Sequence, residues 1–267
     1  MPKVGVNGIN LCYDDYGSGD PVILITGSGA TGKMWTPHQV PALTAAGFRV
    51  ITLDNRGMPP SDLCPDGFTM DDMVADTVGL IKLLGIDRCR VVGFSLGAMM
   101  LQELLLAYPD LITQTVLSAT RGRTDTMRAA MGAAESELAA SGIVLPPHYA
   151  AVVHATRFLS PRTQNDDRRI SDWLDIFEIS LVSPSANRSQ HGLELCGNRL
   201  EEYRKIRSDC LVIGFQDDLI APPHFCREVA DYIPGCRYEE LAGCGHYGFL
   251  EQPERFNSLI IDYFHRS

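Results

Sequence analysis

The chain has 267 residues, of which 45% are hydrophobic, enough to bury one large core. A formal net charge of −10 argues against a surface that binds the phosphates of nucleic acids. The N-terminal residues lack the apolar core of a signal peptide, and no stretch reaches the ~18 apolar residues of a membrane span. We therefore predict a cytoplasmic protein with neither a membrane nor a nucleic acid as partner.

Strands and helices alternate along most of the chain. A hairpin is predicted at Val4–Val6 and Ile9–Tyr13, joined by Asn7-Gly8. Such alternation favours an α/β fold with a mostly parallel, doubly wound sheet covered by helices on both faces. Further strands are predicted at Pro21–Ile25, Arg49–Leu53, Cys89–Val92, Leu111–Leu117, Asp209–Phe215 and Arg237–Leu241, and helices at Thr36–Ala46, Met70–Leu84 and Ala98–Tyr108.

The pattern changes between residues 123 and 206, where strand-like runs are missing and helical spacing prevails. We expect residues 1–122 and 207–267 to form the core and 123–206 to form a helical subdomain. Its apolar side chains are candidates to roof a pocket, although each of them can equally pack against the core. The helical segments are Thr126–Ala140, Tyr149–Leu159, Ser171–Ile179 and Leu193–Ile206, and the candidate side chains are Met127, Met131, Tyr149, Val153, Phe158, Trp173 and Phe177.

A G-x-S-x-G pentapeptide spans residues 93–97, between a predicted strand and a predicted helix. This context is typical of a nucleophile elbow, in which a sharp turn presents the central Ser95 and flanking glycines avoid crowding. An ordinary turn with a buried serine is the structural alternative. Two further polar groups follow predicted strands in the order that a catalytic triad of this type requires: Asp217-Asp218 and then His246. The carboxyl ends of parallel strands are where open α/β sheets build their sites.

These motifs together resemble the α/β-hydrolase superfamily, in particular its capped branch of enol-lactonases, cofactor-free perhydrolases and carbon–carbon bond hydrolases. The similarity rests on the elbow and on three further motifs, and it weakens between about residues 122 and 206. It implies that the helical subdomain is a cap, inserted before the strand that carries the acid. The three motifs are D-x-R-G at Asp54–Gly57, D-x-x-x-P at Asp218–Pro222 and G-x-G-H at Gly243–His246.

The resemblance implies that Ser95 is the nucleophile, His246 the general base and Asp218 the acid. Asp218 is favoured over Asp217 because only Asp218 has proline four residues later, at Pro222. His148 and His154 lie in the predicted cap, where packing or surface roles are favoured over substrate contact. Cys244 lies two residues before His246, and packing is again the favoured interpretation.

An oxyanion hole needs two backbone N–H donors. Leu96, the residue after the nucleophile, is expected to supply one, and Ser28 the other, with Gly27 as the less favoured alternative. Related proteins usually have His-Gly where this chain has Thr26-Gly27, which leaves open what braces the loop. The glycine spacing of this loop also occurs in nucleotide-binding loops, but the rest of such a motif is missing.

Three hypotheses of function follow. The first is a serine hydrolase of a small to medium carboxylic ester, lactone or thioester. The second uses the same triad for carbon–carbon bond hydrolysis, perhydrolysis, or acyl transfer and cyclisation. The third is a non-catalytic ligand sensor with the same fold. An acyl compound is the expected ligand, with no cofactor and no metal, because the eight cysteines are scattered and no ligands cluster. Candidate substrate contacts are Gly27, Tyr149, Trp173 and Phe177.

Overall fold

The computed structural model describes residues 2–180, 190, 193 and 197–266. Within these residues, eight strands form one sheet in the order β1-β2-β4-β3-β5-β6-β7-β8. β1 and β2 form an antiparallel hairpin, β2 runs antiparallel to β4, and all other neighbours are parallel, so the mostly parallel sheet is confirmed. The strands are β1 (Lys3–Val6), β2 (Ile9–Tyr16), β3 (Asp20–Ile25), β4 (Phe48–Asp54), β5 (Cys89–Phe94), β6 (Ile112–Ser118), β7 (Asp209–Phe215) and β8 (Arg237–Leu241).

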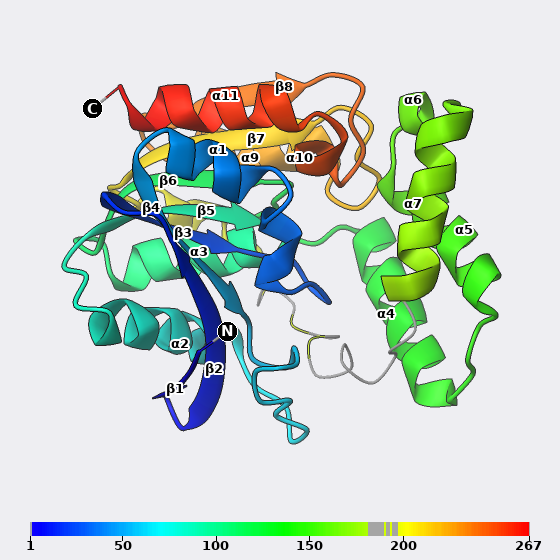
Figure 1. Cartoon of the computed structure of the whole chain (residues 1–267), viewed down its shortest axis with the longest axis horizontal. Helices are drawn as coiled ribbons and strands as arrows, with labels where there is room; N and C mark the ends of the chain where they lie inside the picture. The colour runs from blue at the N-terminus through cyan, green and yellow to red at the C-terminus, as the bar shows by residue number, and fades with distance from the viewer. Residues whose placement is uncertain (1, 181–189, 191–192, 194–196, 267) are drawn as a thin grey trace.

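Helices cover both faces of the sheet, as predicted (Figure 1). Val22 and Leu24 of β3 pack with the helices of one face, whereas Ile23 and Ile25 pack with those of the other, because successive side chains of a strand point to opposite sides. One layer holds η1 (Gly32–Trp35), α1 (Gln39–Ala45), α10 (Gly248–Glu251) and α11 (Pro253–Phe264); the other holds α2 (Met70–Leu83), α3 (Leu96–Ala107), α8 (Leu200–Tyr203) and α9 (Pro223–Tyr232).

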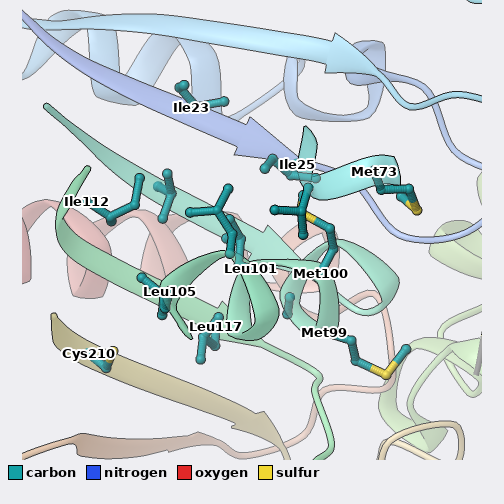
Figure 2. Packing of buried hydrophobic residues seen from close by; sticks show 14 of the residues in the cluster. Ile23, Ile25, Met73, Met99, Met100, Leu101, Leu105, Ile112, Leu117 and Cys210 are labelled. Carbon is teal, nitrogen blue, oxygen red and sulfur yellow. The ribbon is translucent and has the colours of Figure 1, made fainter. Parts of the chain in front are cut away.

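The central helix α3 is the most deeply buried of these helices. Met100 and Leu101 are fully buried and contact the same cluster as Ile23 and Ile25 of β3 (Figure 2). Full burial of one such side chain stabilises the fold by roughly 1.5–3 kcal/mol. The elbow that precedes α3 is therefore attached to rigid elements on both sides.

Four of the five described helices between β6 and β7, all except α8, lie together beyond one end of the sheet (Figure 1). Ala151, Ala155, Leu159 and Phe177 form a small apolar core of their own. The boundaries 123 and 206 stay a prediction. Within the described residues, no helix is both long and apolar enough to cross a membrane. The four helices are α4 (Thr126–Ser141), α5 (Pro147–Phe158), α6 (Pro161–Gln164) and α7 (Asp167–Ser180).

Three predicted helices differ from the structure by more than two residues at one end. The helix expected over Ser171–Ile179 begins earlier, at Asp167. The helix expected from Thr36 begins only at Gln39, because Thr36 ends the preceding 3₁₀ turn and bonds through its N–H to Lys33 O. The helix expected over Leu193–Ile206 is wrong in extent: in its described part, helix is limited to Leu200–Tyr203. Gly197 has a φ of 76°, which an α-helix does not accommodate. Residues 194–196 lie outside the described part.

Candidate active site

Ser95, Asp218 and His246 follow β5, β7 and β8, three strands of the parallel part of the sheet. The carboxyl ends of parallel strands lie at the same edge, so the fold brings these side chains together from distant parts of the sequence. The helices α4–α7 follow β6 and extend from this same edge (Figure 1).

Ser95 lies in a sharp turn between β5 and α3, with φ 53° and ψ −119°. A Cβ on Gly93 would lie 2.8 Å from the Cα of Ala98, and one on Gly97 would lie 2.6 Å from the carbonyl oxygens of Ile25 and Thr26. Neither position accommodates a side chain without backbone movement. Glycine at both positions thus lets the strand and helix approach closely enough to form the elbow.

The side chains of Ser95, His246 and Asp218 form a continuous hydrogen-bonded line. His246 Nδ1 lies 2.8 Å from Asp218 Oδ2, and His246 Nε2 lies 3.1 Å from Ser95 Oγ. Because a carboxylate only accepts, Nδ1 donates its proton to Asp218, and Nε2 is left to accept the proton of the Ser95 hydroxyl. His246 and Asp218 are each only 2% exposed, whereas Ser95 is partly exposed. The serine is therefore the member of the line that solvent and ligands reach.

Asp218, rather than its neighbour Asp217, contacts the imidazole. The second oxygen of Asp218, Oδ1, accepts the main-chain N–H groups of Ile220 and Ala221 at 2.8 and 2.9 Å. These bonds orient the carboxylate and satisfy it in a buried place. Asp217 donates its own main-chain N–H to Cys244 O. Burial, followed by the negative charge of Glu251, raises the pKa of Asp217.

The loop that follows β3 lies against the elbow. A Cβ on Gly27 would lie 3.0 Å from the Cβ of Ser95. Ser28 directly follows Gly27, so it belongs to the segment that packs against the nucleophile. Leu96 begins α3, where the first N–H groups of a helix have no partner within the helix. The two N–H groups predicted to form an oxyanion hole thus belong to segments that converge on Ser95.

Thr26 braces this loop from within: its hydroxyl donates to Ala30 O at 3.0 Å. Gln190 braces the loop from outside. Its side-chain oxygen accepts the N–H of Gly29 at 2.8 Å, and its amide nitrogen donates to Arg56 O at 2.9 Å. Gln190 could not be recognised from the sequence, because nothing in its local sequence marks a contact 161 residues away.

Aromatic rings surround His246. The ring centroids of Phe94 and Phe158 lie 4.8 and 5.4 Å from the imidazole. Phe158 also stacks on His154, which contacts the Tyr247 hydroxyl through Nε2 at 3.0 Å. Burial, assisted by the positive charge of Arg157 and by repulsion from His246 when that imidazole is protonated, lowers the pKa of His154 to about 4. His154 is thus a neutral packing group at physiological pH.

Trp173 and Phe177 belong to the same aromatic cluster. Trp173 stacks on Tyr247 with centroids 6.0 Å apart, and Phe177 meets His154 edge-on at 4.6 Å. Tyr149, in contrast, is 58% exposed. Phe94 and Tyr247 were missed in the sequence, although each adjoins a predicted catalytic residue.

Cys244 is fully buried, and burial together with the negative charge of Glu251 raises its pKa to about 12. The Cys244 thiol therefore stays protonated and serves in packing. Among the described residues, no three His, Cys, Asp or Glu side chains are grouped as a metal site would require.

Arg56 pairs with the buried Asp76 through two contacts of 2.6 Å, and Asp54 accepts the N–H of Gly32 at 2.7 Å. These two residues of the D-x-R-G motif hold loops together.

The fold and this arrangement at the sheet edge define an α/β-hydrolase. The model of the alpha/beta hydrolase family matches residues 22–259, and the chain belongs to that family. It is 46% identical over 257 residues to a protein of Mycobacterium tuberculosis that carries the name non-heme bromoperoxidase BpoC, covering 96% of this chain and 98% of that protein. The crystal structure of BpoC superposes with a TM-score of 0.93 over 96% of each chain.

Two more distant relatives carry hydrolase names. A carbamate hydrolase, RutD, of Pantoea ananatis is 27% identical over 92% of this chain and 89% of its own length. The enol-lactonase of Burkholderia xenovorans is 26% identical, with a TM-score of 0.85 over 99% of this chain and 100% of its own. The chain is accordingly an enzyme of the hydrolase type.

Proposed function

We propose that this enzyme is a serine hydrolase that cleaves a small to medium carboxylic ester, lactone or thioester through an acyl-enzyme. The observation that carries the proposal is the hydrogen-bonded line from Ser95 through His246 to Asp218. A serine hydroxyl is a weak nucleophile at neutral pH and needs a base within hydrogen-bond reach, which His246 Nε2 supplies.

In the first half of the reaction, Ser95 Oγ attacks the substrate carbonyl carbon while its proton passes to His246 Nε2. Asp218 stabilises the imidazolium that forms. The carbonyl oxygen becomes an oxyanion, which accepts hydrogen bonds from the N–H groups of Leu96 and Ser28. When the tetrahedral intermediate collapses, the bond to the alcohol or thiol breaks and the leaving group takes the proton from His246. The acyl group stays on Ser95.

In the second half, His246 takes a proton from water, and the resulting nucleophile attacks the acyl carbon. The ester bond to Ser95 breaks, Ser95 regains its proton from His246, and a carboxylic acid leaves. The residues of the site supply a nucleophile, an acid–base group and charge stabilisation, so the proposed cycle uses no cofactor and no metal. A nucleic acid or membrane partner has no part in it, and we propose a cytoplasmic location.

The aromatic rings beside His246 suit a substrate with an apolar group near its carbonyl. We place Gly27 and Trp173 along the substrate path, with Phe158 as an additional contact. Phe177, only 4% exposed in the core of the inserted helices, would meet the substrate through its edge alone. Tyr149 is proposed to meet only a substrate that extends toward solvent, because 58% of its surface is exposed.

Labelling with a fluorophosphonate tests the proposal, because such reagents react strongly with an activated serine and very slowly with ordinary hydroxyl groups. We expect one phosphonyl group per chain, located at Ser95 by peptide mass spectrometry. Ser95→Ala should keep the fold, lose the label and lose hydrolysis of ester, lactone and thioester substrates by more than about a thousandfold. Labelling elsewhere, or activity retained in Ser95→Ala, would contradict the proposal.

Perhydrolysis is a second candidate, favoured by the 46% identity to a protein named as a bromoperoxidase. Here hydrogen peroxide, rather than water, would attack the acyl group on Ser95 and release a peracid, which then oxidises bromide. Incubation with an ester and hydrogen peroxide, with bromide oxidation as the readout, distinguishes the two activities. Perhydrolysis predicts bromide oxidation that requires the ester and disappears in Ser95→Ala. Release of the carboxylic acid alone favours hydrolysis.

A further inference from the structure

A buried carboxylate, that of Glu251, lies behind the histidine loop and has no part in the steps above. Glu251 is only 5% exposed. It is the last residue of α10, the short helix that begins two residues after His246, and its own N–H donates to Tyr247 O at 2.9 Å. The side chain is thus carried by the same turn of chain that carries the proposed base.

Both oxygens of Glu251 are used. Oε1 accepts the N–H and the hydroxyl of Ser160, at 3.0 and 2.7 Å, and Oε2 accepts the N–H of Gly245 at 2.6 Å. Ser160 is fully buried and lies between α5 and α6. Hydrogen bonds to a buried carboxylate are about twice as strong as those between neutral groups. One side chain therefore joins the residue before His246 to the helices inserted between β6 and β7.

The two segments that Glu251 joins also pack backbone to backbone. A Cβ on Gly245 would lie 2.6 Å from Phe158 O and from Ser160 N. The N–H of Tyr247 donates to Phe158 O at 3.3 Å, on the other side of His246. The residues on both sides of His246, Gly245 and Tyr247, are consequently fixed against the same short segment of the insertion, residues 158–160. This restricts the movement of the imidazole.

We propose that Glu251 is a positioning residue: by fixing Gly245 to Ser160, it keeps His246 Nε2 in line with Ser95 and couples the base to the docked position of the helical insertion. This inference rests on the proposed function, since it assumes that His246 is the base. Glutamine at position 251 would keep one acceptor oxygen but place an amide N–H₂ against one of the donors. The Gly245 or Ser160 group left without an acceptor would then move, and His246 would move with it.

The test compares Glu251→Gln and Ser160→Ala with Glu254→Gln as the matched control, since Glu254 is exposed and lies three residues further along. We measure kcat and KM on a chromogenic ester and the rate of fluorophosphonate labelling per folded molecule. A displacement of about 1 Å costs about a hundredfold in rate. We therefore expect Glu251→Gln to lower kcat and the labelling rate about a hundredfold, with KM within about twofold of wild type.

Ser160→Ala removes the hydroxyl that donates to Glu251 and that also caps α6 by accepting the Thr163 N–H at 3.3 Å. It keeps the Ser160 N–H that donates to Glu251, so we expect a smaller loss of kcat, about tenfold. If both residues act through one contact, the double variant should be no slower than Glu251→Gln alone. The proton between His246 Nδ1 and Asp218 gives a separate readout by NMR: its resonance should shift in Glu251→Gln and stay in place in Glu254→Gln. A purely structural role would lower thermal stability without moving this resonance.

Wild-type rates in Glu251→Gln, or a change in KM with kcat preserved, would overturn the positioning role. If Glu251→Gln does not fold, Ser160→Ala decides: an unchanged kcat and labelling rate would sink the inference. Failure of the proposed function is distinguishable, because wild-type protein would then show no Ser95-dependent labelling. Labelling that depends on Ser95 but is indifferent to Glu251 would refute this inference alone.

Discussion

The Nδ1 atom of His246 lies 2.8 Å from the Oδ2 atom of Asp218. We expect Asp218→Asn to lower kcat by roughly 10⁴-fold, because an amide in place of the carboxylate favours the wrong imidazole tautomer; the magnitude is that of a serine protease with the same arrangement. Steady-state kinetics on a chromogenic ester would measure the loss.

Asp217→Asn is the matched control, since Asp217 is adjacent and makes no contact with the imidazole in the structure. Its kcat should stay within a few-fold of wild type, because only a partly buried carboxylate that repels Glu251 is neutralised. A large loss in Asp217→Asn with little loss in Asp218→Asn would show that the acid has been assigned to the wrong residue.

Gly97→Ala should damage both stability and catalysis. The new Cβ would lie 2.6 Å from the carbonyl oxygens of Ile25 and Thr26, so the loop that carries Ser28 must shift away from the elbow. Overpacking of this kind costs about 1–3 kcal/mol, which urea unfolding measures, and the labelling rate of Ser95 should fall with it. Gly5→Ala is the control, because no atom lies within 4 Å of its Cβ position. Equal labelling rates in the two variants would contradict the close packing at the elbow.

His154 should make the fold less stable in weakly acidic solution. Its pKa falls from the ordinary 6.5 to about 4 on folding, so between these values the unfolded chain binds more protons than the folded chain, and stability decreases as the pH falls. We expect His154 to lower the free energy of unfolding by about 2 kcal/mol when the pH falls from 7 to 5. Urea unfolding of wild type and His154→Gln measures the effect. The difference between their free energies of unfolding should change between pH 7 and pH 5 and stay constant between pH 7 and pH 8. Parallel curves down to pH 5 would refute it.

Hydrolysis should survive exhaustive dialysis against EDTA and need no nicotinamide, flavin or nucleotide. Ser95, His246 and Asp218, with two main-chain N–H donors, supply every group that acyl transfer requires. A serine-directed phosphonate should instead abolish activity. If chelation removed the activity and one added metal restored it, the serine-hydrolase proposal would fail even though the family assignment stands.

Local sequence determined where most helices and strands lie and which segments are helix and which are strand. The apolar run predicted Asp209–Phe215, a buried strand, with the bounds that the structure has, because such a strand depends on neighbours a few residues away. Arg237–Leu241, a mostly exposed edge strand, also has its predicted bounds. The glycines around Ser95 identified the elbow, because the turn itself demands them. Local pattern misled at Leu193–Ile206, where Gly197 and the contact of the Arg199 N–H with Gly122 O override helical spacing.

Only the tertiary structure decided how the groups at the sheet edge contact one another. Motif spacing favoured Asp218 over the adjacent Asp217, but the orientation of the two carboxylates depends on how the turn after β7 packs against the histidine loop. The contacts of Glu251 with Ser160 and of Gln190 with Gly29 join residues 91 and 161 positions apart. No short-range pattern records such pairs, because their geometry arises when the chain between β6 and β7 docks on the carboxyl edge of the sheet.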